Sequence, residues 1–129
     1  MILVDSDVLI AHLRGDAVAR DWLMAARQIR GQLATSAVSV AEITGGMRSA
    51  ERHDVWRLLG GLVVEPVTEA IARRAGEYQR ELRRAHVGIG LADYLIAATA
   101  DVRRLELASL NVRHFPMFPG LSPPFPYGP

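Results

Sequence analysis

Short apolar segments that alternate with helical patterns place the strongest limit on the fold of this chain. Residues 1–5, 32–36, 62–65 and 105–109 have the length and the apolar composition of buried strands. Helical patterns fill the chain between them. Strands that alternate with helices in this way predict an α/β fold, in which a mostly parallel sheet of four to five short strands carries helices on both faces.

The predicted helices are defined by apolar spacing and by the residues at their ends. Val18, Trp22, Ala25 and Ile29 recur at spacings of four, three and four residues, which places them on one apolar helix face. Glycine pairs and capping residues mark the other helix ends. We therefore predict helices over residues 6–13, after Asp16, over 39–47 and 51–59, from Thr68 to beyond Leu82, and around Asp93 to about residue 102.

Three acidic residues stand in apolar surroundings, unlike the other acids of the chain. Asp5 ends the first predicted strand, Glu42 lies within AVSVAEI, and Asp93 lies within GLADYLIAATA. A buried carboxylate without a partner costs several kcal/mol, so each of these acids needs a cation or hydrogen-bond donors. The pattern predicts that the three acids share one cation site.

The predicted topology places these acids at one end of the sheet. Asp5 ends the first strand, Glu42 follows the second strand by one helical turn, and Asn111 follows the fourth strand. In parallel sheets, ligands bind outside the carboxyl ends of the strands. We therefore expect the side chains to meet at that edge.

Each acid also has a purely structural interpretation. Asp5 or Asp7 can cap the first helix. Ser39 and Glu42 fit the capping box S-x-x-E, which would make Glu42 a partner of the backbone. Asp93 lies in the first turn of its helix, where a carboxylate favours the positive end of the helix dipole. These interpretations stay open for each residue taken singly.

The composition limits the kind of cation and the kind of chemistry. The chain has no cysteine, which excludes thiolate metal sites. Its 15 basic residues are all arginine, which excludes sites that need a lysine, such as Schiff bases and P-loops. Its histidines are isolated and have no zinc-type spacing. Carboxylates without such ligands favour Mg2+ or Mn2+, which can activate water against a phosphodiester.

Two further segments carry polar residues of possible functional use. Asn111 can orient a water molecule at the cation or act as a turn residue, and Arg113 can face a phosphate or solvent. His114 is the histidine closest to the predicted site. A basic helix face, which consists of Arg80, Arg83, Arg84 and His86, either follows a nucleic-acid backbone or is a solvated face with acid–base pairs.

Four motifs in this order resemble those of PIN domains of the VapC type, the toxin ribonucleases of bacterial type II toxin–antitoxin pairs. The motifs are VDSDVLI from Val4, SVAEI from Ser39, GLADYLIAATA from Gly90 and LNVRHF from Leu110. The resemblance covers about residues 1–121, which leaves residues 122–129 as a proline-rich tail. His114 departs from the pattern, because the family usually has an acid there, and this predicts weaker binding of a second metal ion.

The resemblance implies a metal-dependent endoribonuclease with a three-layer fold. Asp5, Glu42 and Asp93 would be ligands of Mg2+ or Mn2+, and Asn111 would join them in catalysis. Ser6, Arg113 and His114 become candidate contacts of the RNA substrate. The implied partners are a VapB-like antitoxin, which would block the site, and a second copy of the chain in a homodimer.

The sequence also allows two alternative functions, and it predicts the cellular compartment of the protein. Asp5 and Asp7 also fit the D-x-D motif of haloacid-dehalogenase-like phosphatases, although the lysine of that family is missing. A catalytically weak PIN module that acts as a binding partner is the non-enzymatic alternative. No uncharged apolar stretch reaches the roughly 18 residues of a membrane helix, and Asp5 interrupts the N-terminal apolar run, so we expect a cytoplasmic protein.

Overall fold

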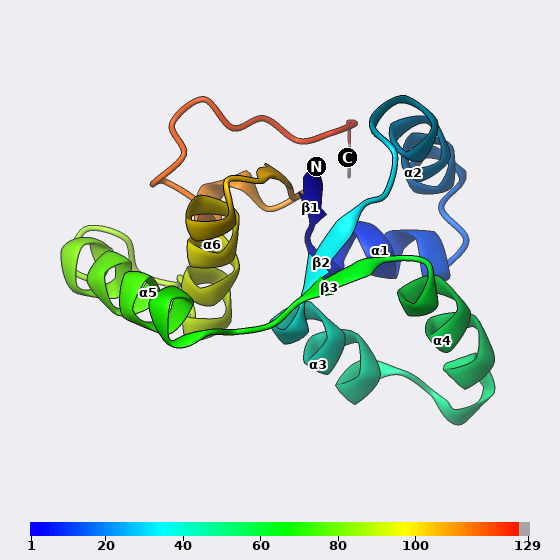
Figure 1. The fold of residues 1–129 in the computed structure, drawn as a ribbon, viewed down its shortest axis with the longest axis horizontal. Coiled ribbons are helices and arrows are strands. Elements are labelled where there is room, and N and C mark those ends of the chain that lie inside the picture. The colour runs from blue at the N-terminus through cyan, green and yellow to red at the C-terminus, as the bar shows by residue number, and fades with distance from the viewer. Residues whose placement is uncertain (127–129) are drawn as a thin grey trace.

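The sheet lies at the centre of the molecule and all its strands are parallel. The computed structural model describes residues 1–126 of the chain, and the sheet order is β3-β2-β1-β4 (Figure 1). The predicted α/β fold is therefore confirmed, with four strands and no fifth within residues 1–126. The strands are β1 (Ile2–Val4), β2 (Ala34–Ser36), β3 (Val63–Glu65) and β4 (Glu106–Ala108).

Every predicted helix is present, with ends that differ by a few residues from those expected. The largest difference is at the third helix, which begins at Ala37 instead of Ser39. The helices are α1 (Ser6–Leu13), α2 (Ala17–Arg30), α3 (Ala37–Gly46), α4 (Arg52–Gly60), α5 (Glu69–Leu82) and α6 (Leu91–Arg103), and two short 3-10 turns are η1 (Ser49–Glu51) and η2 (Val112–His114).

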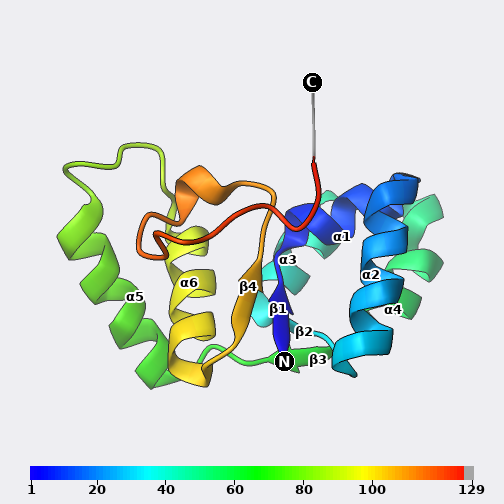
Figure 2. The ribbon, with the colours of Figure 1, turned by 90° about the horizontal axis from the view of Figure 1, so that it is seen from above.

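Alternating side chains of β1 pack into two separate cores. Ile2 and Val4 pack in one core with residues of α1, α2 and α4, whereas Leu3 packs in the other with residues of α5 and α6. Side chains alternate between the two faces of a strand, so a three-residue strand supplies both cores. Figure 2 shows the result as three layers, with α5 and α6 on one side of the sheet and α2 and α4 on the other.

Small buried residues allow α6 to lie close to its neighbours. Ala97, Ala98 and Ala100 are buried together with Thr99, whose hydroxyl donates to the carbonyl of Leu95 at 2.7 Å. The helix packs against α5 on one side and against the sheet on the other. This burial fixes the position of the α6 N-terminus, which carries Asp93.

The proline-rich tail packs on the rest of the domain through Phe125. This side chain is buried, and its ring centroid lies 6.2 Å from that of Trp22 on α2. Residues 127–129 of the predicted tail lie outside the described residues, and the boundary at residue 121 stays a prediction. None of the helices within residues 1–126 is long and apolar enough to cross a membrane.

The predicted capping box at the start of α3 is wrong. The N-cap is Ser36, whose hydroxyl accepts from the backbone N–H of Val38 at 3.0 Å. Ser36 is also the last residue of β2, so the chain turns directly from strand into helix. Ser39 is thus already inside α3, where its hydroxyl is buried without a hydrogen-bond partner, and Glu42 does not cap the helix.

The two serines should therefore respond in opposite ways to substitution by alanine. Ser36→Ala removes the cap and should cost about 1 kcal/mol of unfolding free energy. Ser39→Ala removes a buried hydroxyl with no partner, so it should leave the stability unchanged or slightly higher. Urea denaturation of both variants measures the difference. Equal destabilisation by the two substitutions would contradict this placement of the helix start.

Candidate active site

Asp5 is the most buried acid of the site and is held at both carboxylate oxygens. It follows β1 and caps α1, and its side chain is buried. Its Oδ1 accepts from the backbone N–H of Ser6 at 2.7 Å, and its Oδ2 accepts from the hydroxyl of Ser109 at 2.8 Å. Asp5 is thus the helix cap that the sequence allowed, and it also takes part in a contact across the sheet.

Asp7 and Ser109 belong to the same cluster, although the sequence did not single them out for it. Asp7 Oδ2 accepts from the Ser109 hydroxyl at 3.2 Å and from the backbone N–H groups of Leu110 and Asn111 at 3.0 and 3.1 Å. Asp7 Oδ1 is buried and has no hydrogen-bond partner. No local sequence pattern marks this contact, because it depends on the pairing of β1 with β4, which brings the residues after both strands together.

Glu42 joins the cluster through a hydroxyl group of α1. Its Oε1 accepts from the Ser6 hydroxyl at 3.0 Å, and the same hydroxyl lies 3.4 Å from Asp5 Oδ1. The Glu42 side chain is otherwise exposed. The Ser6 hydroxyl thus lies between Asp5 and Glu42, and the prediction that these two acids share a cation stays a prediction.

Asp93 lies beside His114 and Asn111. Its Oδ2 is 3.0 Å from His114 Nδ1 and accepts weakly from the backbone N–H of Gly90 at 3.3 Å. Asn111 Nδ2 lies 2.9 Å from the same His114 nitrogen. One ring nitrogen cannot donate to a carboxylate and accept from an amide at once, so the proton on Nδ1 decides which contact forms.

The basic residues differ in their surroundings. Arg113 is exposed, and its guanidinium has no partner among residues 1–126. On α5, Arg73 pairs with Glu69 and Arg74 with Glu77, each at 2.9 Å, as expected of a solvated helix face. The predicted basic face itself, which consists of Arg80, Arg83, Arg84 and His86, forms no ion pair within the described part of the chain.

Burial and like charges disturb the ionisation of the acid cluster. Burial, followed by the charge of Asp7, raises the pKa of Asp5 to about 7, while hydrogen bonds from Ser109 and Ser6 act in the opposite direction. Glu42 adds a smaller upward effect. Burial also raises the pKa of Asp7, against the hydrogen bonds that it accepts. A positive charge placed here would oppose both effects.

Asp5, Asp7 and Glu42 are linked through serine hydroxyl groups, whereas Asp93 contacts His114 and Gly90 and has no hydrogen bond to the other three acids. Within residues 1–126, no three carboxylate or imidazole groups are positioned to hold one metal ion between them. Ser6 separates Asp5 from Glu42, and Ser109 separates Asp5 from Asp7. Negative carboxylates repel one another, and hydroxyl groups between them reduce this repulsion.

Comparison with known proteins gives consistent matches over nearly the whole chain. Residues 2–117 match a family model described as PIN domain. The chain is 67% identical over 125 residues to "Ribonuclease VapC10" of Mycobacterium tuberculosis, with 97% of this chain and 93% of the relative covered. It is 40% identical over 125 residues to "Ribonuclease VapC19" of the same species, with 97% and 100% covered. A solved toxin–antitoxin complex from Klebsiella pneumoniae contains a chain of similar fold, with a TM-score of 0.81, 26% identity and coverage of 97% and 98%. The matches span all the segments that carry the acid cluster.

Proposed function

Because the chain belongs to the VapC family of PIN-domain ribonucleases, we propose that it hydrolyses RNA with Mg2+ or Mn2+ at the acid cluster. The observation that carries this proposal is the cluster of Asp5, Asp7 and Glu42, which lies beyond the carboxyl ends of β1 and β2 and is bound by Ser109 after β4. Family membership gives no support to the phosphatase alternative, in which Asp5 would be a nucleophile.

The donor atoms of the cluster suit a hard divalent cation. They are carboxylate oxygens, and one of them, Asp7 Oδ1, is buried without a partner. Mg2+ and Mn2+ prefer such oxygen ligands and retain several water molecules. Asp5, Glu42 and Asp93 would hold the ion. When bound, it would supply a water molecule of lowered pKa and positive charge beside the phosphate.

Neighbouring groups of the chain hold these acids in position. The Ser6 N–H and the Ser109 hydroxyl each bind one oxygen of Asp5, which fixes the plane of this carboxylate. The Ser6 hydroxyl does the same for Glu42. Because these donors occupy only part of the coordination capacity of each carboxylate, the remaining lone pairs stay available to a cation.

Residues after β4 would contact the substrate. His114 is in reach of Asp93 and Asn111, so its proton can orient either side chain. Arg113 is exposed beside them and can bind a phosphate in bidentate fashion. Ser6 is already bound to Asp5 and Glu42, which favours a role in positioning the acids over a direct contact with RNA.

The purified protein should cleave single-stranded RNA with Mg2+ or Mn2+ and lose this activity in EDTA. Asp93→Asn should lower the cleavage rate by roughly a hundredfold or more, because it removes a charge that the cation needs. Gel assays with a labelled RNA measure both effects. The matched control is Asp101→Asn on the same helix, since Asp101 pairs with Arg74 and Tyr78 away from the site.

Two outcomes would overturn the proposed function. The first is full activity in EDTA. The second is a protein that folds and binds a partner but cleaves no RNA with either ion, which is the behaviour of the non-catalytic alternative. An equal loss of cleavage in Asp93→Asn and Asp101→Asn would remove the evidence for Asp93 as a ligand.

We further propose a VapB-like antitoxin as the protein partner and a homodimer as the form of the toxin. The toxin–antitoxin complex from Klebsiella pneumoniae, which contains a chain of similar fold, supports the first part. Co-expression with any antitoxin-like reading frame found directly upstream, followed by size-exclusion chromatography with light scattering, tests both. A protein that stays monomeric and does not bind the co-expressed antitoxin would contradict both proposals.

A further inference from the structure

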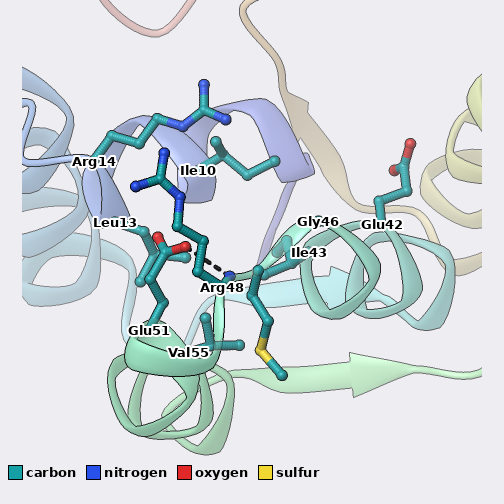
Figure 3. Close-up of a pocket in the computed structure, with 10 residues that line it drawn as sticks. Ile10, Leu13, Arg14, Glu42, Ile43, Gly46, Arg48, Glu51 and Val55 are labelled. Carbon is teal, nitrogen blue, oxygen red and sulfur yellow. Dashed lines mark hydrogen bonds between the residues drawn. The ribbon is translucent and has the colours of Figure 1, made fainter.

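A pocket beside the acid cluster contains two arginines that have no acidic partner. It has a volume of about 400 Å3 and lies between α1, α3 and the segment from η1 to α4 (Figure 3). Glu42 lines it at one side, so the pocket is continuous with the proposed catalytic site. Arg14, at the end of α1, and Arg48, just before η1, line it at the other.

The two guanidinium groups are directed to the same side of this pocket. Figure 3 shows both projecting away from Val55, with the Glu42 carboxylate on the opposite side. Both side chains are exposed, and neither forms a hydrogen bond or ion pair with another residue of the described range 1–126. Two unpaired cations on one rim favour an anion between them, because an anion relieves their mutual repulsion.

The two acidic side chains of the pocket, Glu51 and Glu42, already accept hydrogen bonds from other groups. Glu51 accepts from the backbone N–H of Arg48 at 2.8 Å, and its own N–H donates to the Arg48 carbonyl at 2.9 Å. This reciprocal pair fixes the backbone at Arg48. Glu42 accepts from Ser6 and faces the acid cluster. The whole chain has a formal charge of only +1, so Arg14 and Arg48 form a local positive site and are not part of a general basic surface.

The floor of the pocket is apolar and its size suits a nucleotide. It consists of Ile10, Leu13, Ile43, Met47 and Val55. An apolar floor with a charged rim is typical of sites that hold the ring of a ligand and orient its polar group. The guanidinium group of arginine binds two phosphate oxygens in bidentate fashion.

We propose that Arg14 and Arg48 bind a backbone phosphate of the RNA substrate next to the scissile one, with the adjoining nucleotide over the apolar floor. The inference rests on the proposed ribonuclease activity and assigns it a substrate-binding subsite. The strand would run from the acid cluster, past Glu42, into the pocket. Binding here would then strengthen the Michaelis complex without touching the reacting atoms.

The test compares Arg14→Gln/Arg48→Gln with wild type on a labelled RNA oligonucleotide at several salt concentrations. The variant should raise KM about tenfold with kcat little changed, and the slope of log KM against log salt should fall by about 0.7, the value for one lost phosphate contact on a single strand. The control is Arg73→Gln/Arg104→Gln, which removes the same charge from exposed residues near the end of α6 that is opposite to Asp93. Thermal melting should show all three proteins folded, because all four side chains are exposed.

The outcomes separate this subsite from the proposed function. Absence of cleavage by the wild type contradicts the proposed function, and binding of the oligonucleotide to an Asp93→Asn background then still tests the subsite. If the wild type cleaves RNA, an unchanged KM and salt slope in Arg14→Gln/Arg48→Gln overturns the subsite. An equal effect in the arginine control also overturns it, in favour of a general electrostatic field. Loss of antitoxin binding alone, with RNA kinetics unchanged, reassigns the pocket to the protein partner and overturns it as well.

Discussion

Asp5→Asn should produce an inactive protein that is more stable than the wild type. The pKa of Asp5 is raised to about 7 by burial and by the charges of Asp7 and Glu42, so the ionised carboxylate is unfavourable in the folded state. An amide carries no such charge. It can accept from the Ser6 N–H and donate to the Ser109 hydroxyl, whose proton is then free to bind Asp7.

The direction of the stability change follows from how the unfolding free energy depends on pH. Between the ordinary pKa near 3.8 and the folded value of about 7, the folded protein holds a proton that the unfolded chain has lost. The unfolding free energy of the wild type should therefore fall as the pH rises through this window. Asp5→Asn should remove this decline and add on the order of 1–3 kcal/mol at pH 8 without metal. Urea titrations at pH 5 and pH 8 in EDTA measure both quantities.

A matched control separates charge relief from loss of a helix cap. Asp16 caps α2 and accepts from the N–H groups of Val18 and Ala19, but it lies outside the acid cluster. Asp16→Asn should retain RNA cleavage and gain no stability. If Asp5→Asn is less stable than the wild type, or still cleaves RNA, then Asp5 only caps α1.

Asp7→Ala should have the second large effect, because one oxygen of Asp7 holds the whole segment that follows β4. The substitution leaves the part-buried N–H of Leu110 without an acceptor, at a cost of about 1–3 kcal/mol, and leaves the N–H of Asn111 with only the Ser109 hydroxyl as its acceptor. Relief of repulsion with Asp5 offsets part of that cost. We expect a net loss of stability and a fall in RNA cleavage of tenfold or more, because Asn111 and His114 lose their fixed position.

Hydrogen exchange distinguishes this positioning role from a direct role in catalysis. Leu110 and Asn111 amides should exchange quickly in Asp7→Ala and remain protected in Asp7→Asn, whose amide oxygen still accepts from them. The conservative variant should also recover most of the kcat. If both variants lose activity while the amides stay protected, Asp7 acts on the cation or substrate and does not serve mainly to hold the segment.

The fold was largely predictable from the sequence because the dominant signals were local. Apolar runs and capping residues defined the strands and the helices, and alternation between them defined the parallel sheet. The start of α3 was missed because Ser36 and Ser39 are equally good capping residues in a sequence, and only the end of β2 decides between them. The order β3-β2-β1-β4 depends on packing between distant segments, which no local pattern records.

The assignment of Asp5, Glu42 and Asp93 to one site stays a prediction, and the contacts around Asp5 were not predictable from the sequence. Asp5, Glu42 and Asp93 were identifiable because each stands in apolar sequence. Asp7 and Ser109 were not, since a second aspartate at a helix start and a serine after a strand are both ordinary. Their contacts join residues more than 100 positions apart, so they require the pairing of β1 with β4.

This pairing of the first and last strands has a consequence for synthesis of the protein. A nascent chain that has been translated only as far as α6 already contains Asp5, Glu42 and Asp93, but it has no neighbour for the outer side of β1. It also lacks the serine hydroxyl and the backbone amides that orient Asp5 and Asp7. A product that ends before β4 would therefore lack the contacts that orient Asp5 and Asp7. RNA cleavage is expected only after β4 has left the ribosome and paired with β1.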